Sequence, residues 1–412
     1  MRVQVSSPAE HGELLDFPIA DRLVTWTDPR VKIGTDGAHR HVVRYLQMAD
    51  RLYVVKELPE RLAEREYTLL RHLATASIPA VEPVAFVSER GDGADGEGLL
   101  VTRHLDFSLP YRRLFSGRVG IPQLRDQLVD ALVGLLVRAH LVGFFWGDCS
   151  LSNTLFRRDA GQLSAYIVDV ETGEAHEQLS DGQRNFDLTI AQENFLGGLL
   201  DQQAAGRLPA ELDVVATAQA LEDRYQLLWA EVTSAEVFGP DERYRVAQRI
   251  ALVNHLGFDV VELEVSTDDN GSRLRLTPCV VENGFHSPRL AALTGLHSEE
   301  NQARRLLNDI RQFGAFQPRP LPESVVAVRW LDQVFEPTVA AVPPDLADRL
   351  EPAELYLQIL EHRWFLSEPA GADVGIEAAM RSYFADVLPF LTGGRVVHDL
   401  PTTQVPIIAA EP

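Results

Sequence analysis

The first hundred residues alternate between apolar and polar positions in a way that predicts a small antiparallel sheet with one helix. Segments 31–38, 41–46 and 51–58 are rich in strand formers, and in the last of these every second residue shares one face, which is the period of a strand. After Pro59, apolar side chains recur at helical spacing as far as Leu73. Two more strands are expected at 81–87 and 98–102, with a surface loop at 89–97 that is rich in Gly and Asp.

The pattern then changes to longer helical periods. Residues 122–142 predict an amphipathic helix that Gly143 is placed to stop. A short strand is expected at 165–168, and a further helix opens at 186–188. Residues 244–256 look helical, and 258–265 with 273–281 predict a hairpin around the Asn-Gly pair at 270–271. Several helices follow, so the chain as a whole is expected to be α+β.

Composition limits the protein class. A chain of 412 residues with 45% hydrophobic and 24% charged residues is typical of a globular protein with two or three domains. It has no apolar run of about 18 residues and no apolar leader, so a cytoplasmic location without a membrane span is expected. Its two cysteines, Cys149 and Cys279, form no C-x-x-C pair and indicate neither disulfides nor zinc. The net charge of −22 disfavours nucleic acid as a partner.

Lysine usage points to one position. Of the 38 basic residues only Lys32 and Lys56 are lysine, and Lys56 shares a strand face with apolar side chains. It is either an edge-strand lysine with its ammonium in water or an ammonium that needs an anionic partner. Glu66 lies on the apolar stripe of the following helix, whereas Glu64 lies on its polar side, so Glu66 is the expected partner of Lys56.

A second group of residues carries a recognisable spacing. Residues 146–153 read W-G-D-C-S-L-S-N, so Asn153 follows Asp148 by five positions, and Asp169 ends an apolar run in V-D-V-E. This arrangement resembles a protein-kinase-like site. H-L-V-G at 140–143 extends the resemblance, which is nearest to the aminoglycoside- and choline-kinase-like, lipopolysaccharide-kinase-like and RIO-like branches. The chain resembles a bacterial family that joins such a unit to a C-terminal domain of unknown role.

The resemblance implies specific roles. Asp148 would accept the proton of a substrate hydroxyl, and Asn153 and Asp169 would hold Mg²⁺ against the phosphates of ATP. Lys56 and Glu66 would orient the nucleotide. Further residues keep two readings each: Gly34 and Gly37 are a phosphate cradle or a plain hairpin turn, Glu171 is a metal ligand or holds its loop, and Asp187 supports the Asp148 loop from behind or caps a helix N-terminus.

Two departures qualify the resemblance. Trp146 stands where the loop usually begins with histidine, and Val170 with Glu171 replaces Phe-Gly after the metal aspartate. The first expectation is therefore an ATP-dependent phosphotransferase that moves the γ-phosphoryl group to a hydroxyl of an unidentified small molecule or protein. The alternative is a catalytically weak or inactive kinase-like regulator that binds nucleotide and presents its C-terminal domain to a protein partner.

The expected organisation has four parts. Residues 1–27 form an N-terminal extension, 28–105 and 106–225 form the two lobes of the kinase-like domain, and 226–412 form a mixed α/β domain. Residues 293–307 scan like a helix-turn-helix, but a packing helix capped by Ser298 explains the same letters. Trp330, Phe335, Trp364 and Phe365 are expected in the core, and Cys149 is expected to be a small loop residue. Arg157 and Arg158 are either solvated turn residues, which is favoured, or contacts for an anionic substrate. Lys32 either flanks the first strand, which is favoured, or reaches a phosphate.

Overall fold

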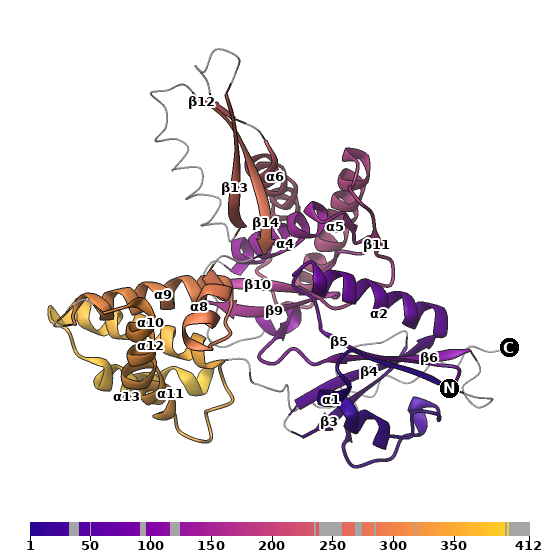
Figure 1. Ribbon diagram of the computed structural model, residues 1–412, viewed down its shortest axis with the longest axis horizontal. Coiled ribbons are helices and arrows are strands. Elements are labelled where there is room, and N and C mark those ends of the chain that lie inside the picture. The colour runs from indigo at the N-terminus through magenta and orange to yellow at the C-terminus, as the bar shows by residue number, and fades with distance from the viewer. Residues whose placement is uncertain are drawn as a thin grey trace. The chain divides into compact units, whose positions relative to one another are not determined.

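The computed structural model describes residues 1–32, 41–49, 51–90, 96–115, 124–234, 236–238, 258–267, 274–283, 286–317, 319, 321–391 and 394. The chain divides into two compact units. Unit 1 contains Met1–Arg71 and Val81–Asp106, and unit 2 contains His72–Ala80 and Phe107–Arg395. Figure 1 shows their elements with the labels used below.

Unit 1 is built on an antiparallel sheet of six strands in the order β1-β5-β6-β4-β3-β2. The strands are β1 (Arg2–Val5), β2 (Val31–Lys32), β3 (Val42–Met48), β4 (Arg51–Pro59), β5 (Pro83–Ser88) and β6 (Glu97–Arg103). The strands expected from 41 to 102 therefore form. Lys32 is exposed on the edge strand β2, where its ammonium is in water.

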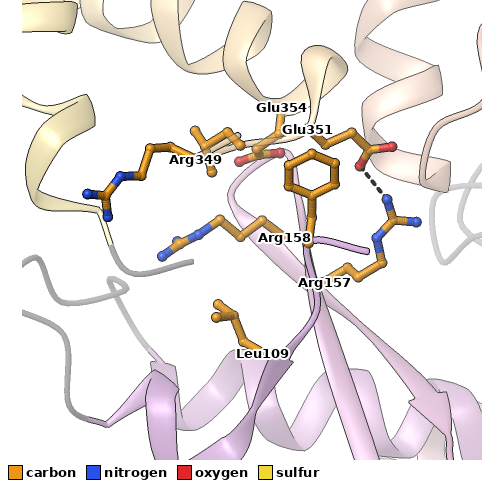
Figure 2. A pocket seen from close by; sticks show the side chains of 8 residues that line it. Leu109, Arg157, Arg158, Arg349, Glu351 and Glu354 are labelled. Carbon is orange, nitrogen blue, oxygen red and sulfur yellow. Dashed lines mark ion pairs between the residues drawn. The ribbon is translucent and has the colours of Figure 1, made fainter. Parts of the chain in front are cut away.

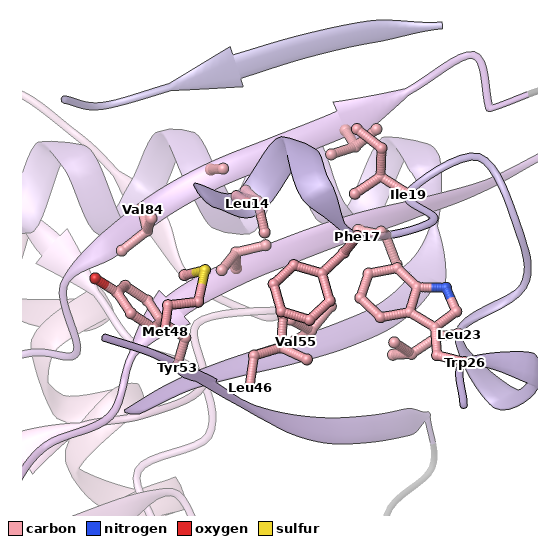
Figure 3. Close-up of a cluster of buried hydrophobic side chains, with 14 residues drawn as sticks. Leu14, Phe17, Ile19, Leu23, Trp26, Leu46, Met48, Tyr53, Val55 and Val84 are labelled. Atoms are coloured by element: carbon pink, nitrogen blue, oxygen red, sulfur yellow. The ribbon is translucent and has the colours of Figure 1, made fainter. Parts of the chain in front are cut away.

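The N-terminal segment is a layer of this unit. Strand β1 pairs with β5, and α1 (Pro8–His11) and the 3₁₀ turns Gly12–Asp16 and Leu23–Thr25 follow it. The apolar side chains of this segment bury one face of the sheet against Tyr53 and Val55 of β4 (Figure 3); they are Leu14, Phe17, Ile19, Leu23 and Trp26. Their spacing fits neither a helix nor a strand, which is why the pattern looked like a weak extension.

Glu57, on that same face of β4, forms ion pairs that the sequence analysis did not predict. Glu57 is 3% exposed and Arg90 5%, and Arg90 Nη1 donates to Glu57 Oε1 at 2.7 Å. Burial alone would raise the pKa of Glu57, yet hydrogen bonds from Arg90, the Leu23 amide and Arg22 lower it. The predicted surface loop at 89–97 is thus wrong at Arg90, which is buried and donates to Ile19 O at 2.7 Å.

The other face of β4 points towards α2 (Glu60–Thr75), the helix predicted after Pro59. Residues at the even positions of β4, including Lys56, lie on this face. Helix α2 begins immediately after β4, so side chains of the two elements pack against each other. This arrangement sets Lys56 beside the apolar stripe that carries Glu66.

After residues 72–80, unit 2 continues with β7 (Leu109–Pro110), α3 (Tyr111–Leu114) and the long α4 (Leu124–Leu141). Helix α4 is buried on nearly all sides, more deeply than its predicted amphipathic pattern required. Strands β9 (Thr154–Asp159) and β10 (Gln162–Ile167) form a hairpin that β7 extends, and β8 (Phe144–Phe145) pairs with β11 (Glu174–Ala175). Helices α5 (Asp181–Ala204) and α6 (Val214–Thr233) complete this part.

The C-terminal part is mostly helical. Strands β12 (Glu236–Phe238), β13 (Phe258–Thr267) and β14 (Leu274–Asn283) form a sheet in the order β12-β14-β13, so the predicted hairpin forms. The helices are α8 (His286–Thr294), α9 (Glu300–Ala315), α10 (Glu323–Trp330), α11 (Glu336–Ala340), α12 (Pro352–Ala370) and α13 (Ile376–Asp386), with a π-helical turn at Leu331–Phe335 and a 3₁₀ turn at Leu388–Phe390. The mixed helix and sheet content agrees with the α+β prediction.

Several expectations for this part need correction. Trp330 and Phe335 are core residues, but Trp364 and Phe365 are 57% and 55% exposed, because both point away from the packed side of α12. The cap before α9 is Glu299, whose amide donates to Gln302 Oε1, one residue after the predicted Ser298. The predicted glycine loop at Gly34 and Gly37, the helix at 244–256 and the turn at 268–271 lie outside the described residues.

The arginines at 157 and 158 also differ from expectation. Both lie in β9, and the Arg157 side chain is only 17% exposed and forms two ion pairs. They had looked like solvated turn residues because two adjacent charges in a polar stretch usually face water. Along the part of the chain that the structure describes, no helix has the length and apolar character needed to cross a bilayer.

Candidate functional site

In unit 1 Lys56 and Glu66 meet as the sequence predicted. Lys56 Nζ donates to Glu66 Oε1 at 2.9 Å, and the exposed fractions of the two side chains are 18% and 2%. Glu66 lies on the stripe of α2 that faces β4, so helical and strand periodicity together bring the pair into contact. The pair holds the Lys56 ammonium at a partly buried position.

In unit 2 the loop between β8 and β9 carries the W-G-D motif. Gly147 has a φ of +74°, and a Cβ there would lie 3.2 Å from the carbonyl oxygen of Thr172 and 3.0 Å from the Phe145 ring. Glycine is therefore required for the turn that aims the loop. The turn also directs the amides of Trp146 and Gly147 to the Asp187 carboxylate, at 2.7 and 2.8 Å.

Asp187 holds the loop from inside α5. It is fully buried, and besides the two amides it contacts His140 Nε2 at 3.1 Å. Through these contacts Asp187 supports the loop that carries Asp148. The alternative, a helix cap at Asp187, is wrong because α5 begins at Asp181 and is capped by Ser180.

A buried chain of hydrogen bonds extends from Asp187 to α6. Burial lowers the pKa of His140, although its hydrogen bond with Asp187 acts in the opposite direction. A neutral His140 donates through Nε2 to Asp187 and accepts at Nδ1 from the Tyr225 hydroxyl, 2.6 Å away. Burial raises the pKa of Tyr225 to about 12, so this hydroxyl keeps its proton. Helix α6 thus braces the W-G-D loop.

The carboxylate of Asp148 is held between two side-chain amides. Asn153 Nδ2 donates to Asp148 Oδ2 at 2.8 Å, and Asn194 Nδ2 donates to Asp148 Oδ1 at 3.0 Å. These bonds fix the rotamer of Asp148. The Asp148 carboxylate therefore has a defined orientation at the start of the loop.

Asp169 lies where the second motif turns away from β10. Its carbonyl oxygen accepts from the Trp146 indole at 2.9 Å, and its Oδ1 accepts from the Glu171 amide at 2.9 Å. Trp146 is fully buried and therefore ties the loop of Asp148 to the segment of Asp169. The residue that replaces histidine thus has a clear structural role. Glu171 is half-buried beside Asp169.

The donor set suits a hard cation. Asn153 uses its amide nitrogen on Asp148, which leaves its amide oxygen as a ligand atom, and Asp169 supplies a carboxylate. Oxygen ligands of this kind are those that Mg²⁺ prefers, so the residues present fit the ion implied by the resemblance. Cys149 is not a competing nucleophile, because burial and the charges of Asp187 and Asp148 raise the pKa of its thiol well above the usual value.

Sequence reasoning missed Asn194, Tyr225 and the indole contact of Trp146. One signal for Asn194 was available, since it follows Asp187 by seven residues, about two helical turns, and so shares its face of α5. The contact of Tyr225 with His140 joins positions 85 residues apart. No local pattern marks it.

Comparisons with known proteins match two regions of this chain to families. Residues 19–204 match the lipopolysaccharide kinase (Kdo/WaaP) family, and residues 227–388 match a domain of unknown function, DUF4032. The comparison with curated proteins gave no match. Among solved structures, WaaP in complex with acyl carrier protein is similar at 20% identity and a TM-score of 0.36, over 56% of this chain and 100% of that chain.

Proposed function

We propose that this chain, which carries a kinase-like region over residues 19–204 and a second domain after it, is an ATP-dependent phosphotransferase with a hydroxyl acceptor. Lys56, oriented by Glu66, binds the nucleotide phosphates. Asp148 accepts the proton of the acceptor hydroxyl. Asn153 and Asp169 hold Mg²⁺, which when bound neutralises the charge on the phosphate oxygens.

One observation carries the proposal. Asp148 and Asn153, which only a motif spacing had linked, share a hydrogen bond of 2.8 Å, and Asn194 fixes the other carboxylate oxygen. A base needs a defined direction as well as a charge, because proton transfer requires close alignment with the attacking hydroxyl. Two amide donors on one half-buried aspartate provide that direction.

The departures from the motif are compatible with activity. Trp146 keeps the loop attached to both Asp187 and the Asp169 carbonyl. Val170 is fully buried, so the position next to Asp169 still packs an apolar side chain. Trp146 and Val170 thus keep the Asp148 loop and the Asp169 segment packed, which supports the proposal. The alternative is a regulator that binds nucleotide without turnover. The experiment below distinguishes it from a phosphotransferase.

The test uses the full-length protein with MgCl₂ and γ-labelled ATP. Label is followed into inorganic phosphate, into the protein itself and into small molecules of a cell extract. Asp148→Asn removes the base but keeps the side-chain size, so transfer should fall by roughly 10²- to 10⁴-fold. Nucleotide binding, measured by calorimetry with ATP and Mg²⁺, should persist.

Asp201→Asn is the matched control, because Asp201 is exposed on the same helix as Asp187. It should leave both transfer and binding unchanged. Equal transfer by Asp148→Asn and the wild type would show that Asp148 is not the base. Binding of ATP by the wild type without transfer to any acceptor would support the regulatory alternative.

A further inference from the structure

The β9–β10 hairpin connects the two proposed metal ligands to the C-terminal helices. Asn153 immediately precedes β9, and Asp169 follows β10 by two residues. At this end the Val168 amide donates to Asn153 O at 3.0 Å. The first residue pair of the hairpin is Thr154 with Ile167 and the last is Asp159 with Gln162. At about 3.4 Å per residue, the tip lies roughly 20 Å from the end that carries Asn153.

The tip turns tightly and ends against α9. Ala160 and Gly161 have φ values of 53° and 86°, as a two-residue hairpin turn requires. Asp159 is 2% exposed, and it accepts from the amides of Gln302 at 2.8 Å and Asn301 at 3.2 Å. A carboxylate at the first turn of a helix satisfies its otherwise unpaired N–H groups. Asp159 thereby attaches the tip to the start of α9.

The backbone of the tip is also bound by the helical part. The Ala160 amide donates to Glu354 Oε2 at 2.8 Å, and the Ala160 carbonyl accepts from Arg305 Nη1 at 3.2 Å. Gln302 Nε2 donates to the carbonyl of Arg158 at 2.9 Å. Helices α9 and α12 together therefore satisfy polar groups that the hairpin itself leaves unpaired.

Arg157 links the hairpin to both helices at once. Its Nη1 lies 2.9 Å from Glu299 Oε1 and its Nη2 lies 2.8 Å from Glu351 Oε2; Figure 2 draws the second of these ion pairs. Tyr166, on the partner strand β10, donates to Glu299 at 2.6 Å. A planar guanidinium suits such a two-sided contact, which a point charge does not reproduce.

We infer that the C-terminal helical domain, residues 286–391, positions Asn153 and Asp169 through the β9–β10 hairpin, and that Arg157 is the main positioning residue. This inference rests on the proposed function for the roles of Asn153 and Asp169. A two-stranded hairpin is marginally stable alone, and β7 supports β9 over only two residue pairs. Docking at the tip therefore limits fraying along the strands, and the separation of the two ligands at the base stays fixed.

The test compares full-length Arg157→Gln and Glu299→Gln with the control Arg289→Gln. Arg289 forms an exposed ion pair with Glu323 between α8 and α10, so its loss changes charge in the same domain without touching the hairpin. Amide hydrogen exchange is measured without nucleotide. In Arg157→Gln, peptides covering 148–155 and 166–171 should exchange roughly tenfold faster, since a lost charge-assisted bond changes a local opening equilibrium by about that factor.

A second readout separates positioning from a general loss of stability. The apparent affinity for Mg²⁺, titrated in the presence of ATP, should weaken severalfold in Arg157→Gln, while ATP binding in EDTA stays at the wild-type value. The control should match the wild type in both assays. If Arg157→Gln does not fold, Glu299→Gln carries the same test, because it leaves the pair between Arg157 and Glu351 in place.

Two results would overturn the inference. One is faster exchange confined to the starts of α9 and α12, with peptides 148–155 and 166–171 unchanged. The other is an unchanged Mg²⁺ titration in a folded Arg157→Gln protein. Failure of the proposed function looks different: exchange at the base of the hairpin would still respond to Arg157→Gln, but the wild type would neither bind ATP nor transfer its phosphoryl group.

Discussion

Replacing Asp187 by alanine should destabilise unit 2 more than any exposed substitution on α5. The carboxylate is fully buried and binds the amides of Trp146 and Gly147 and the ring of His140. Asp187→Ala leaves three N–H groups without an acceptor, those of Trp146, Gly147 and His140 Nε2, and each costs about 1–3 kcal/mol. Part of this is offset because a buried charge is no longer desolvated. We therefore expect a loss of about 3–5 kcal/mol.

The measurement is urea unfolding of the full-length protein, followed by tryptophan fluorescence because Trp146 and Trp229 lie in this region. Asp201→Ala is the control: Asp201 is exposed in the last turn of the same helix, and its removal should change the free energy of unfolding by less than about 0.5 kcal/mol. If Asp187→Ala stays within about 1 kcal/mol of that control, the carboxylate does not hold the loop.

Two further predictions concern pH and backbone geometry. Burial raises the pKa of Glu351 from 4.5 to about 7. Between these pH values the folded protein keeps a proton that the unfolded chain releases, so the free energy of unfolding should fall as pH rises from about 5 to 8. In urea titrations at several pH values, Glu351→Gln should make that dependence on pH less steep. At Gly143, with a φ of +76°, a Cβ would lie 2.2 Å from His176 O, whereas Gly161 has a φ of +86° and open space. Gly143→Ala should therefore lower the melting temperature well beyond the Gly161→Ala control, which carries only the ~1–2 kcal/mol backbone cost; equal effects would exclude the clash.

The sequence predicted best where a pattern is local. The strands of unit 1, the helix after Pro59 and the pairing of Lys56 with Glu66 rest on periodicities of two and 3.6 residues, which need no knowledge of the rest of the fold. The kinase-like resemblance rested on the spacing of Asp148, Asn153 and Asp169, and the family match over residues 19–204 confirms it. The catalytic and metal-binding roles of these residues remain predictions.

Prediction failed where a side chain depends on a distant partner. Arg157 and Arg158 are adjacent charges. The contacts of Arg157 with Glu299 and Glu351, more than 140 positions away, make Arg157 half-buried. Arg90 is a similar case, because its partner Glu57 lies on β4, 33 positions earlier in the chain. Composition and periodicity report the average environment of a residue type, and a buried ion pair is the exception that neither detects.

These distant pairs also indicate how the two family regions of the chain depend on each other. A domain that served only as a separate binding module would be expected to meet its neighbour through a small, mainly exposed contact. Here Asp159 is buried at the start of α9, and Arg157 bridges α9 and α12. Removing the helices would break the hydrogen bonds of Asp159 and both ion pairs of Arg157. The hairpin that joins Asn153 to Asp169 therefore has a sequence suited to permanent contact with the helical domain, and separating the domains should disturb the candidate metal site before it disturbs the Lys56 and Glu66 pair.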